Sequence, residues 1–266
     1  MSYQIPLLQT ESPWCPPETL PDLRNADCIA IDLETRDPNL LTKGSGWATN
    51  DGYVIGISMA VDGWAGYFPI RHDNGSNLDP TLILNWLKEQ LSTDCDKVFH
   101  NAMYDVGWLR REGVEVKGEI KDTLIAAPLL DENRFSYSLN ALAKTYTASS
   151  KNEKILRAAA QEWGIDAKGE MWKLPAMYVG PYAEQDAKAT LELWKVLKRD
   201  IEKNDLNFIL ELELSLLPLL LEMRWKGVRV DLEKAEKIQK DLEQQEKNIL
   251  QKIKKQYNRD VEIWNS

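Results

Sequence analysis

Three short runs of apolar residues near the start of the chain constrain its fold most strongly. They cover residues 28–33, 53–61 and 64–70, and each is rich in β-branched or aromatic side chains, which favours buried strands. Asp62 and Gly63 separate the second run from the third and predict a tight hairpin turn. The sequence therefore predicts a sheet that contains at least one antiparallel pair of strands.

Helical patterns follow these strands, with one further strand expected at residues 97–100. The spacing of apolar residues predicts helices over residues 79–91, 104–112, 122–130, 138–146 and 179–204. Residues 36–52 are expected to form a loop, and residues 151–173 have no clear pattern. Because strands and helices are interspersed, we expect an α/β fold with a mixed sheet flanked by helices.

The composition changes after about residue 204 and indicates a second region. Residues 211–224 predict a leucine-rich helix, and Asp231 begins another that runs to about Tyr257 with a single apolar stripe. We therefore expect a proline-rich extended leader at 1–25, a main domain at 26–204 and an incomplete helical extension at 205–266. The Leu41 to Gly52 stretch is expected to be an inserted, mobile surface loop.

Composition excludes several classes of protein. A chain of 266 residues with 43% hydrophobic residues can bury a substantial core. Its three cysteines lack CxxC spacing, and no apolar stretch or signal peptide indicates a membrane partner or export, so a cytoplasmic protein is expected. The net charge of −9 argues against nonspecific coating of nucleic acid, but a narrow contact in a metal-filled cleft stays open.

One pair of acids stands out by its place in the sequence. Asp32 and Glu34 follow an apolar strand, where residues two apart point to the same face of a sheet. The same spacing recurs at 231/233, 241/243 and 260/262, but in or beside charged helical sequence, where side chains two apart diverge. The alternative is an acid pair at a strand end that faces solvent.

Two further pairs lie near predicted strand or helix boundaries. Asn101 and Asp105, and Tyr182 and Asp186, are each four residues apart, which places each pair on one helix face. Solvated helix faces, or a core tyrosine, remain the alternatives. Together the acids of the three pairs supply four hard oxygen donors, which suit two magnesium or manganese ions and are the ligands typical of two-metal phosphodiester hydrolysis.

The segments AIDLET, HNAMYD and YAEQD also carry a resemblance to a known family. In this order they resemble the three exonuclease motifs of the 3′–5′ proofreading domain of family A, DNA polymerase I-like DNA polymerases. This is the tyrosine version within the ribonuclease H-like DEDD superfamily, and a phage-type polymerase is one candidate. The resemblance covers roughly residues 26–199, and ELELSLLPLLLEMRWKGVRVD resembles the start of the polymerase portion and its thumb. No palm motif is present, so we do not expect this chain to synthesise DNA by itself.

The resemblance implies roles for particular residues. Asp32, Glu34 and Asp186 would hold one metal and Asp105 would help to hold a second, while Tyr182 would orient the attacking water. The resemblance also implies substrate contacts by Thr35 through its backbone, and by Asn101 and Tyr104 near the 3′ end. Leu40 is a weak candidate for the apolar wedge of the family.

These expectations lead to one main hypothesis, a metal-dependent 3′–5′ exonuclease acting on single-stranded or frayed DNA 3′ ends. Its partner would be a polymerase portion in cis or in trans, in the host cytoplasm if a phage encodes the chain. A stand-alone RNA-trimming exonuclease of the same superfamily is the alternative. An alternative of another class is a non-catalytic module that docks the primer strand or a polymerase.

Several conspicuous residues are expected to be structural. His72 and His100 lack ligand-like neighbours in the sequence, and Trp86, Trp108 and Trp194 lie among aliphatic residues at helical spacing.

Overall fold

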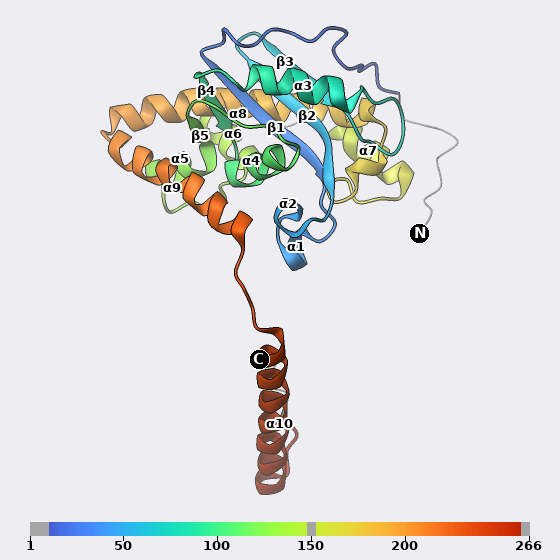
Figure 1. Cartoon of the computed structure of the whole chain (residues 1–266), viewed down its shortest axis with the longest axis vertical. Helices are drawn as coiled ribbons and strands as arrows, with labels where there is room; N and C mark the ends of the chain where they lie inside the picture. Colours follow the sequence, from blue (N-terminus) through green and yellow to red (C-terminus); the bar gives the residue numbers. More distant parts are fainter. Residues whose placement is uncertain (1–10, 148–152, 262–266) are drawn as a thin grey trace. The chain divides into compact units, whose positions relative to one another are not determined.

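The structure is a computed structural model that describes residues 11–147 and 153–261 (Figure 1). The chain forms two compact units, Met1–Trp225 and Lys226–Ser266. The first ten residues of the expected leader and residues 262–266 of the expected extension lie outside the described residues. Among the described helices, none is long and apolar enough to cross a membrane.

In the described part of the first unit, five strands form one mixed sheet in the order β3-β2-β1-β4-β5. Strands β1 and β2, and β2 and β3, are antiparallel, whereas β4 pairs with β1, and β5 with β4, in parallel. The predicted mixed sheet and its hairpin at Asp62 are confirmed. The strands are β1 (Cys28–Arg36), β2 (Tyr53–Val61), β3 (Trp64–Pro69), β4 (Asp96–Phe99) and β5 (Ile120–Asp122).

Helices cover both faces of this sheet (Figure 1). Helices α3 (Pro80–Gln90) and α4 (Ala102–Arg111) pack on the face that carries Ile29, Ile31 and Leu33. The opposite face is covered by α5 (Thr123–Leu130), α6 (Leu139–Tyr146), α7 (Lys154–Trp163) and the long α8 (Ala176–Lys203). Helix α8 packs across β1, β2 and β3. The buried tryptophans 86, 108 and 194 confirm the core positions expected for them.

Several boundaries differ from the sequence expectations. Strand β1 continues to Arg36 instead of ending at Leu33, because its last residues pair with β2. Residues 120–122 form β5, which was not expected from the sequence, and α7 occupies part of the segment without a clear pattern. Short local patterns do not reveal these elements, because pairing with a neighbouring strand or packing on α8 stabilises them.

The expectation of a mobile loop at residues 41–52 is wrong. This stretch contains α1 (Leu40–Lys43) and α2 (Gly46–Thr49), and Trp47 of α2 is only 2% exposed. The Trp47 ring stacks on that of Trp225 with 5.8 Å between centroids, and Gly107 of α4 leaves room for it. A buried indole therefore anchors the loop to the core.

Helix α9 (Asn207–Lys226) belongs mostly to the first compact unit. Its Leu210 and Leu214 pack with one core cluster, and its Leu217 and Leu221 with the other. Because α9 shares both cores, a compact unit extends beyond residue 204. The functional boundary at residue 204 stays a prediction.

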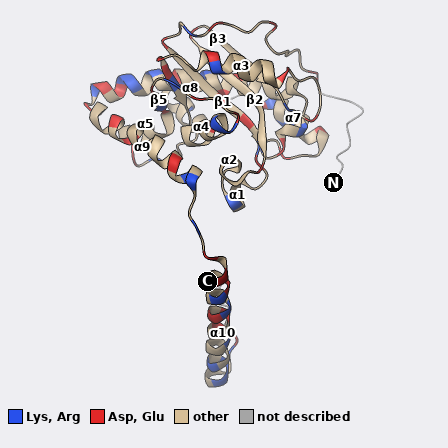
Figure 2. Ribbon diagram, in the orientation of Figure 1, with Lys and Arg blue, Asp and Glu red and all other residues tan. Residues whose placement is uncertain are grey.

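Helix α10 (Leu232–Tyr257) carries most of the second unit. The Asp231 side chain accepts a hydrogen bond from the Lys234 N–H at 3.0 Å and caps its start. Ile238, Leu242 and Ile249 are exposed, and Lys residues are interspersed with Asp and Glu along the helix (Figure 2).

Changing Gly107 to Ala tests how tightly the 41–52 segment is packed. A Cβ at this position would overlap the Trp47 ring, so we expect the free energy of unfolding to fall by about 1–3 kcal/mol. Urea denaturation measures it. In a Trp47→Leu background the same substitution should cost clearly less, because the overlapping ring is gone. Equal costs in both backgrounds would contradict the packing described above.

Candidate active site

Strand β1 presents two carboxylates to the face covered by α8. Ala30, which has the same orientation in the strand, packs in the cluster that contains α8, whereas Ile31 and Leu33 belong to the opposite cluster. Asp32 and Glu34 therefore share the α8 face. The Ser58 hydroxyl of β2 donates to the Asp32 backbone carbonyl at 3.0 Å and to Asp32 Oδ2 at 3.5 Å.

The register of β1 against β2 shifts between Glu34 and Thr35. Before the shift Glu34 pairs with Gly56, and after it Thr35 pairs with Val54. An extra residue, Ile55, is thereby inserted in β2 as a bulge, which rotates the strand beyond it. In β2, the residues before Ile55 therefore point to the opposite face of the sheet from the one that strict alternation would give.

Helix α8 supplies the third pair of residues predicted from the sequence. Tyr182 and Asp186 lie one turn apart and are 8% and 5% exposed. The Tyr182 hydroxyl is hydrogen-bonded to the Asp186 side chain. Burial, followed by the negative charges of Glu34, Asp186 and Asp32, raises the pKa of Tyr182 far above its ordinary value. Its hydroxyl is therefore a hydrogen-bond donor and not a base.

Asp105 reaches the same place from α4. Its Oδ1 accepts a hydrogen bond from the backbone N–H of Leu33, the residue between Asp32 and Glu34, at 3.1 Å. The side chain is buried, and burial followed by the charge of Asp32 raises the pKa of Asp105 well above its usual range. The acids of the first two sequence pairs thus lie together.

Asn101 departs from the sequence expectation. It is the N-cap of α4, has left-handed backbone geometry with φ of 79° and is exposed, so it does not share a helix face with Asp105. Its backbone N–H donates to Asp122 Oδ1 at 3.0 Å. The Asn101 side chain lies at the surface beside the site. Its expected contact with the nucleic-acid strand stays a prediction.

Asp122 is a positioning residue that sequence reasoning missed. Besides Asn101, its carboxylate accepts the N–H of Ala102 at 2.7 Å and that of Leu124 at 2.8 Å. It therefore holds the first turns of α4 and α5 together and so sets where Asp105 lies. The available signal was an aspartate just before an apolar helical run, which is a typical N-cap.

Thr35 and Tyr104 meet at the end of β1. The Thr35 Oγ1 and Tyr104 hydroxyl oxygens are 2.6 Å apart, and the Tyr104 hydroxyl donates to Asp37 Oδ2 at 3.1 Å. Asp37 Oδ2 also accepts the N–H of Gly46 at 2.9 Å. This chain of hydrogen bonds ties the segment that contains α2 to the site.

A tyrosine and a histidine behind Glu34 were not singled out as part of the site from the sequence. Tyr67 of β3 is fully buried, and Gly56 leaves room for its hydroxyl beside Glu34. The Tyr67 hydroxyl lies 2.7 Å from His72 Nε2, and His72 Nδ1 lies 2.9 Å from the Leu174 carbonyl oxygen. Burial lowers the pKa of His72 to about 4. His72 is thus structural, as expected.

The pH dependence of stability should report on His72. Its pKa falls from 6.5 to about 4 on folding, so between these values the unfolded chain binds more protons and stability falls as the pH is lowered. Replacing His72 by Gln should therefore reduce the loss of unfolding free energy between pH 7 and pH 5 by about 2 kcal/mol. Urea titrations at both pH values measure the difference. Parallel losses in the two proteins would show that His72 is not buried as described.

The chemistry of these side chains suits a hard cation, but they do not form a finished metal site. Burial of neighbouring carboxylates is costly, and it raises the pKa of Asp105 and of Tyr182. A divalent cation would relieve this repulsion through oxygen ligands. Yet within residues 11–147 and 153–261 no three His, Cys, Asp or Glu side chains are arranged to hold a metal ion.

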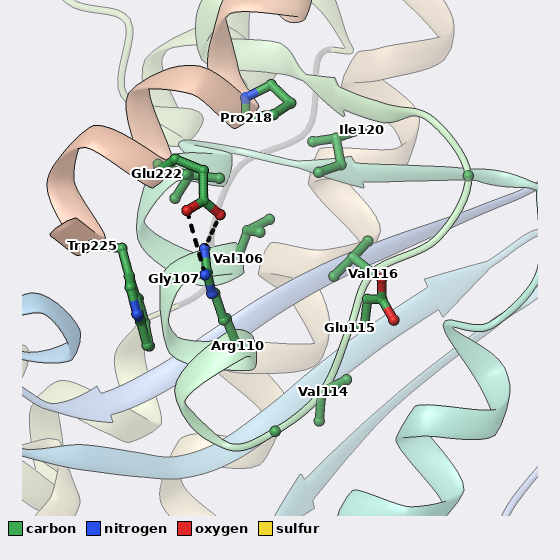
Figure 3. Close-up of a pocket in the computed structure, with 13 residues that line it drawn as sticks. Val106, Gly107, Arg110, Val114, Glu115, Val116, Ile120, Pro218, Glu222 and Trp225 are labelled. Carbon is green, nitrogen blue, oxygen red and sulfur yellow. Dashed lines mark hydrogen bonds and ion pairs between the residues drawn. The ribbon is translucent and has the colours of Figure 1, made fainter.

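A pocket of about 630 Å³ lies elsewhere, between α4, the segment after it and α9 (Figure 3). Val106, Val114 and Leu221 are among its apolar lining residues. Arg110 pairs with Glu222 across it, and its guanidinium carbon lies 4.5 Å from the centre of the Trp225 ring. None of the predicted catalytic residues lines this pocket, so it has no part in the site.

With this geometry in view, comparison with known proteins is decisive. A 3′–5′ exonuclease family of the DNA polymerase A type matches residues 16–202. The chain belongs to this family. A DNA-directed DNA polymerase of Pseudomonas phage M6 is 40% identical in an alignment of 264 residues that covers 96% of this chain and 40% of that protein. The exonuclease chain therefore spans about two fifths of the length of this relative.

Solved structures show the same fold at low sequence identity. The POL domain of Pol1 from M. smegmatis, in complex with DNA primer-template and dNTP, has a TM-score of 0.65 at 17% identity, over 90% of this chain and 35% of that one. NrnC of Brucella melitensis bound to pGG has a TM-score of 0.57 at 19% identity, over 78% and 90%. With bound Mg²⁺ it gives 0.55 at 19%, over 80% and 94%. The ribonuclease H-like class expected from the sequence is confirmed.

Proposed function

We propose that this exonuclease domain removes nucleotides from single-stranded or frayed DNA 3′ ends with the help of two divalent cations, magnesium or manganese. The observation that supports this most is the hydrogen bond from the Leu33 N–H to Asp105, which joins an acid of α4 to the strand of Asp32 and Glu34. Tyr182 and Asp186 complete the set from α8. Such a group of buried acids is suited to a cation that binds a phosphodiester.

In this proposal Asp32, Glu34 and Asp186 hold one cation and Asp105 helps to hold the other. When bound, such ions lower the pKa of a water molecule and stabilise charge on the leaving 3′ oxygen. The Leu33 N–H holds Asp105 in position, and the Ser58 hydroxyl holds Asp32. The Tyr182 hydroxyl, kept protonated by burial and by its acidic neighbours, orients the attacking water as a donor. Thr35, Asn101 and Tyr104 are proposed to contact the terminal nucleotides.

Relatives support DNA over RNA. The Pseudomonas phage M6 relative is a DNA polymerase of which this chain matches 40%, so a polymerase portion, in cis or in trans, is the proposed partner. A phage relative also supports a host cytoplasm as the place of action. NrnC is a structural neighbour with bound pGG, so the experiment below also tests the RNA-trimming alternative.

Removing the two strand acids tests the catalytic assignment. Changing both Asp32 and Glu34 to Ala should lower the rate of shortening of a 5′-labelled single-stranded DNA about a thousandfold or more, because the cation loses two ligands. The control changes Asp241 and Glu243 of α10 to Ala, which removes an acid pair of equal spacing from the exposed surface. The assay uses Mg²⁺, Mn²⁺ or EDTA, and an RNA of the same sequence.

The outcomes separate the alternatives. Retained activity in the variant that lacks the Asp32 and Glu34 carboxylates would overturn the assignment of the site. Faster shortening of RNA than of DNA would favour the RNA-trimming function. Binding of the oligonucleotide by the wild-type chain without shortening in either metal would favour a non-catalytic docking module.

Replacing Tyr182 by Phe tests the role of its hydroxyl. We expect kcat to fall about ten- to a hundredfold with KM changed little, because orientation of the water is lost while the strand still binds. Steady-state measurements in Mn²⁺ give both constants. An unchanged kcat would exclude this hydroxyl from the reaction.

A further inference from the structure

An arginine continues the line of side chains that begins with the two acids of β1. Arg36 pairs with Tyr53 of β2, after the bulge at Ile55. Tyr53 and Ile55 pack with the cluster of α7 and α8, whereas Val54 packs with the opposite cluster. Arg36 therefore extends along the same face as Glu34, and its Cα is about 7 Å further along the strand.

Two aromatic rings hold the Arg36 guanidinium. Its central carbon lies 5.6 Å from the centre of the Tyr53 ring and 4.8 Å from that of Trp172. Trp172 belongs to η1 (Met171–Lys173), whose backbone is fixed in turn. The Asp73 N–H donates to the Trp172 carbonyl at 2.9 Å, and Asn74 Nδ2 donates to that of Lys173 at 2.8 Å. Stacking on rings orients a planar guanidinium and limits its rotation.

Within the described part of the chain, the hydrogen-bonding capacity of Arg36 is unused. Across residues 11–147 and 153–261 its side chain makes no hydrogen bond and no ion pair. The other arginine near this part of β2, Arg71, differs, because it donates twice to Glu112, at 2.7 and 2.8 Å. The Arg36 guanidinium lies over the two rings, and none of its five N–H donors has a hydrogen-bond partner among the described residues. Arg36 is half-buried, and partial exclusion of water strengthens pairing with an anion.

We propose that Arg36, oriented by Tyr53 and Trp172, binds one non-scissile phosphate of the nucleic-acid strand whose end lies at Asp32 and Glu34. The inference rests on the proposed function, because it takes the scissile phosphate to be at these acids. The Arg36 guanidinium lies two residues along the β-strand from Glu34. It is therefore suited to bind the phosphate next to the cleaved one, through two parallel hydrogen bonds. It would counter the repulsion between the acids and the strand.

A purely structural arginine, which only fixes η1 against β1, predicts a different result. Its loss would lower the stability and affect all substrates alike. A phosphate contact instead depends on the charge of one particular phosphate. Neutralising that phosphate should therefore abolish the effect of the substitution.

The experiment combines Arg36→Gln with oligonucleotides in which one phosphate near the 3′ end is an uncharged methylphosphonate. The dissociation constant of each 5′-labelled strand is measured in EDTA, and kcat and KM are measured in Mn²⁺. Arg199→Gln, on the exposed surface of α8, is the control with the same change of charge. Arg36→Lys keeps the charge but loses the planar fork, and thermal melting shows whether each variant is folded.

We expect Arg36→Gln to weaken binding about tenfold, to raise KM similarly and to change kcat little. The salt dependence of single-strand binding should decrease by about 0.7 in logarithmic slope. With a methylphosphonate at one non-scissile position, wild type and Arg36→Gln should bind alike, and Arg36→Lys should fall between them on the charged strand.

The proposal is overturned if Arg36→Gln binds the charged strand as well as Arg199→Gln does, or if no single neutral position removes the difference. If Arg36→Gln does not fold, equal binding of the charged and neutral strands by wild type at every position overturns it. A wild-type chain that binds but does not shorten DNA would refute the proposed function instead, and the binding measurements in EDTA would still test Arg36.

Discussion

The backbone N–H of Leu33 donates to Asp105 where β1 meets α4, and the rest of the site depends on this contact. The Leu33 side chain faces the core of α3 and α4. In the strand, however, Leu33 stands between the two acids that face α8, so its N–H lies next to both of them. This hydrogen bond brings the Asp105 carboxylate, which comes from the helices on one face of the sheet, to the edge of the face that α8 covers. Asp122 fixes the start of α4 and thereby the direction from which Asp105 approaches.

Repulsion among buried acids explains the chemistry of their neighbours. The pKa of Asp105 and of Tyr182 is raised by burial first and by adjacent carboxylates second. A tyrosine in this environment retains its proton, which suits it to orient water and not to remove a proton from it. In the proposed function, cations and one aromatic-bound arginine would counter the negative charge of this chain, which is −9 in total, where the nucleic-acid strand is proposed to bind.

Much of the fold follows from local patterns. The apolar runs predicted β1, β2 and β3, and the N-cap aspartates and helical spacing predicted α3 and α10, because each signal lies within a few residues. Strand β5 and helix α7 were missed because partners distant in sequence stabilise them. Of the site, the alternation of β1 placed Asp32 and Glu34 together, and the spacing of Tyr182 and Asp186 placed them on one helix face. The shared face of Asn101 and Asp105 was wrong because Asn101 adopts a left-handed cap conformation.

The sequence by itself determined the order of the elements, the two acids on one face of β1 and, through its motifs, the family. Tertiary structure alone decided which distant residues meet. A bulge of one residue turned Tyr53 to the face of the acids, and η1 brought Trp172 against Arg36, 136 positions earlier in the chain. Trp47 joined the core only because Gly107 and Trp225 leave a place for its ring. Such contacts depend on strand register and on the shape of the packed core, which no short stretch of sequence specifies.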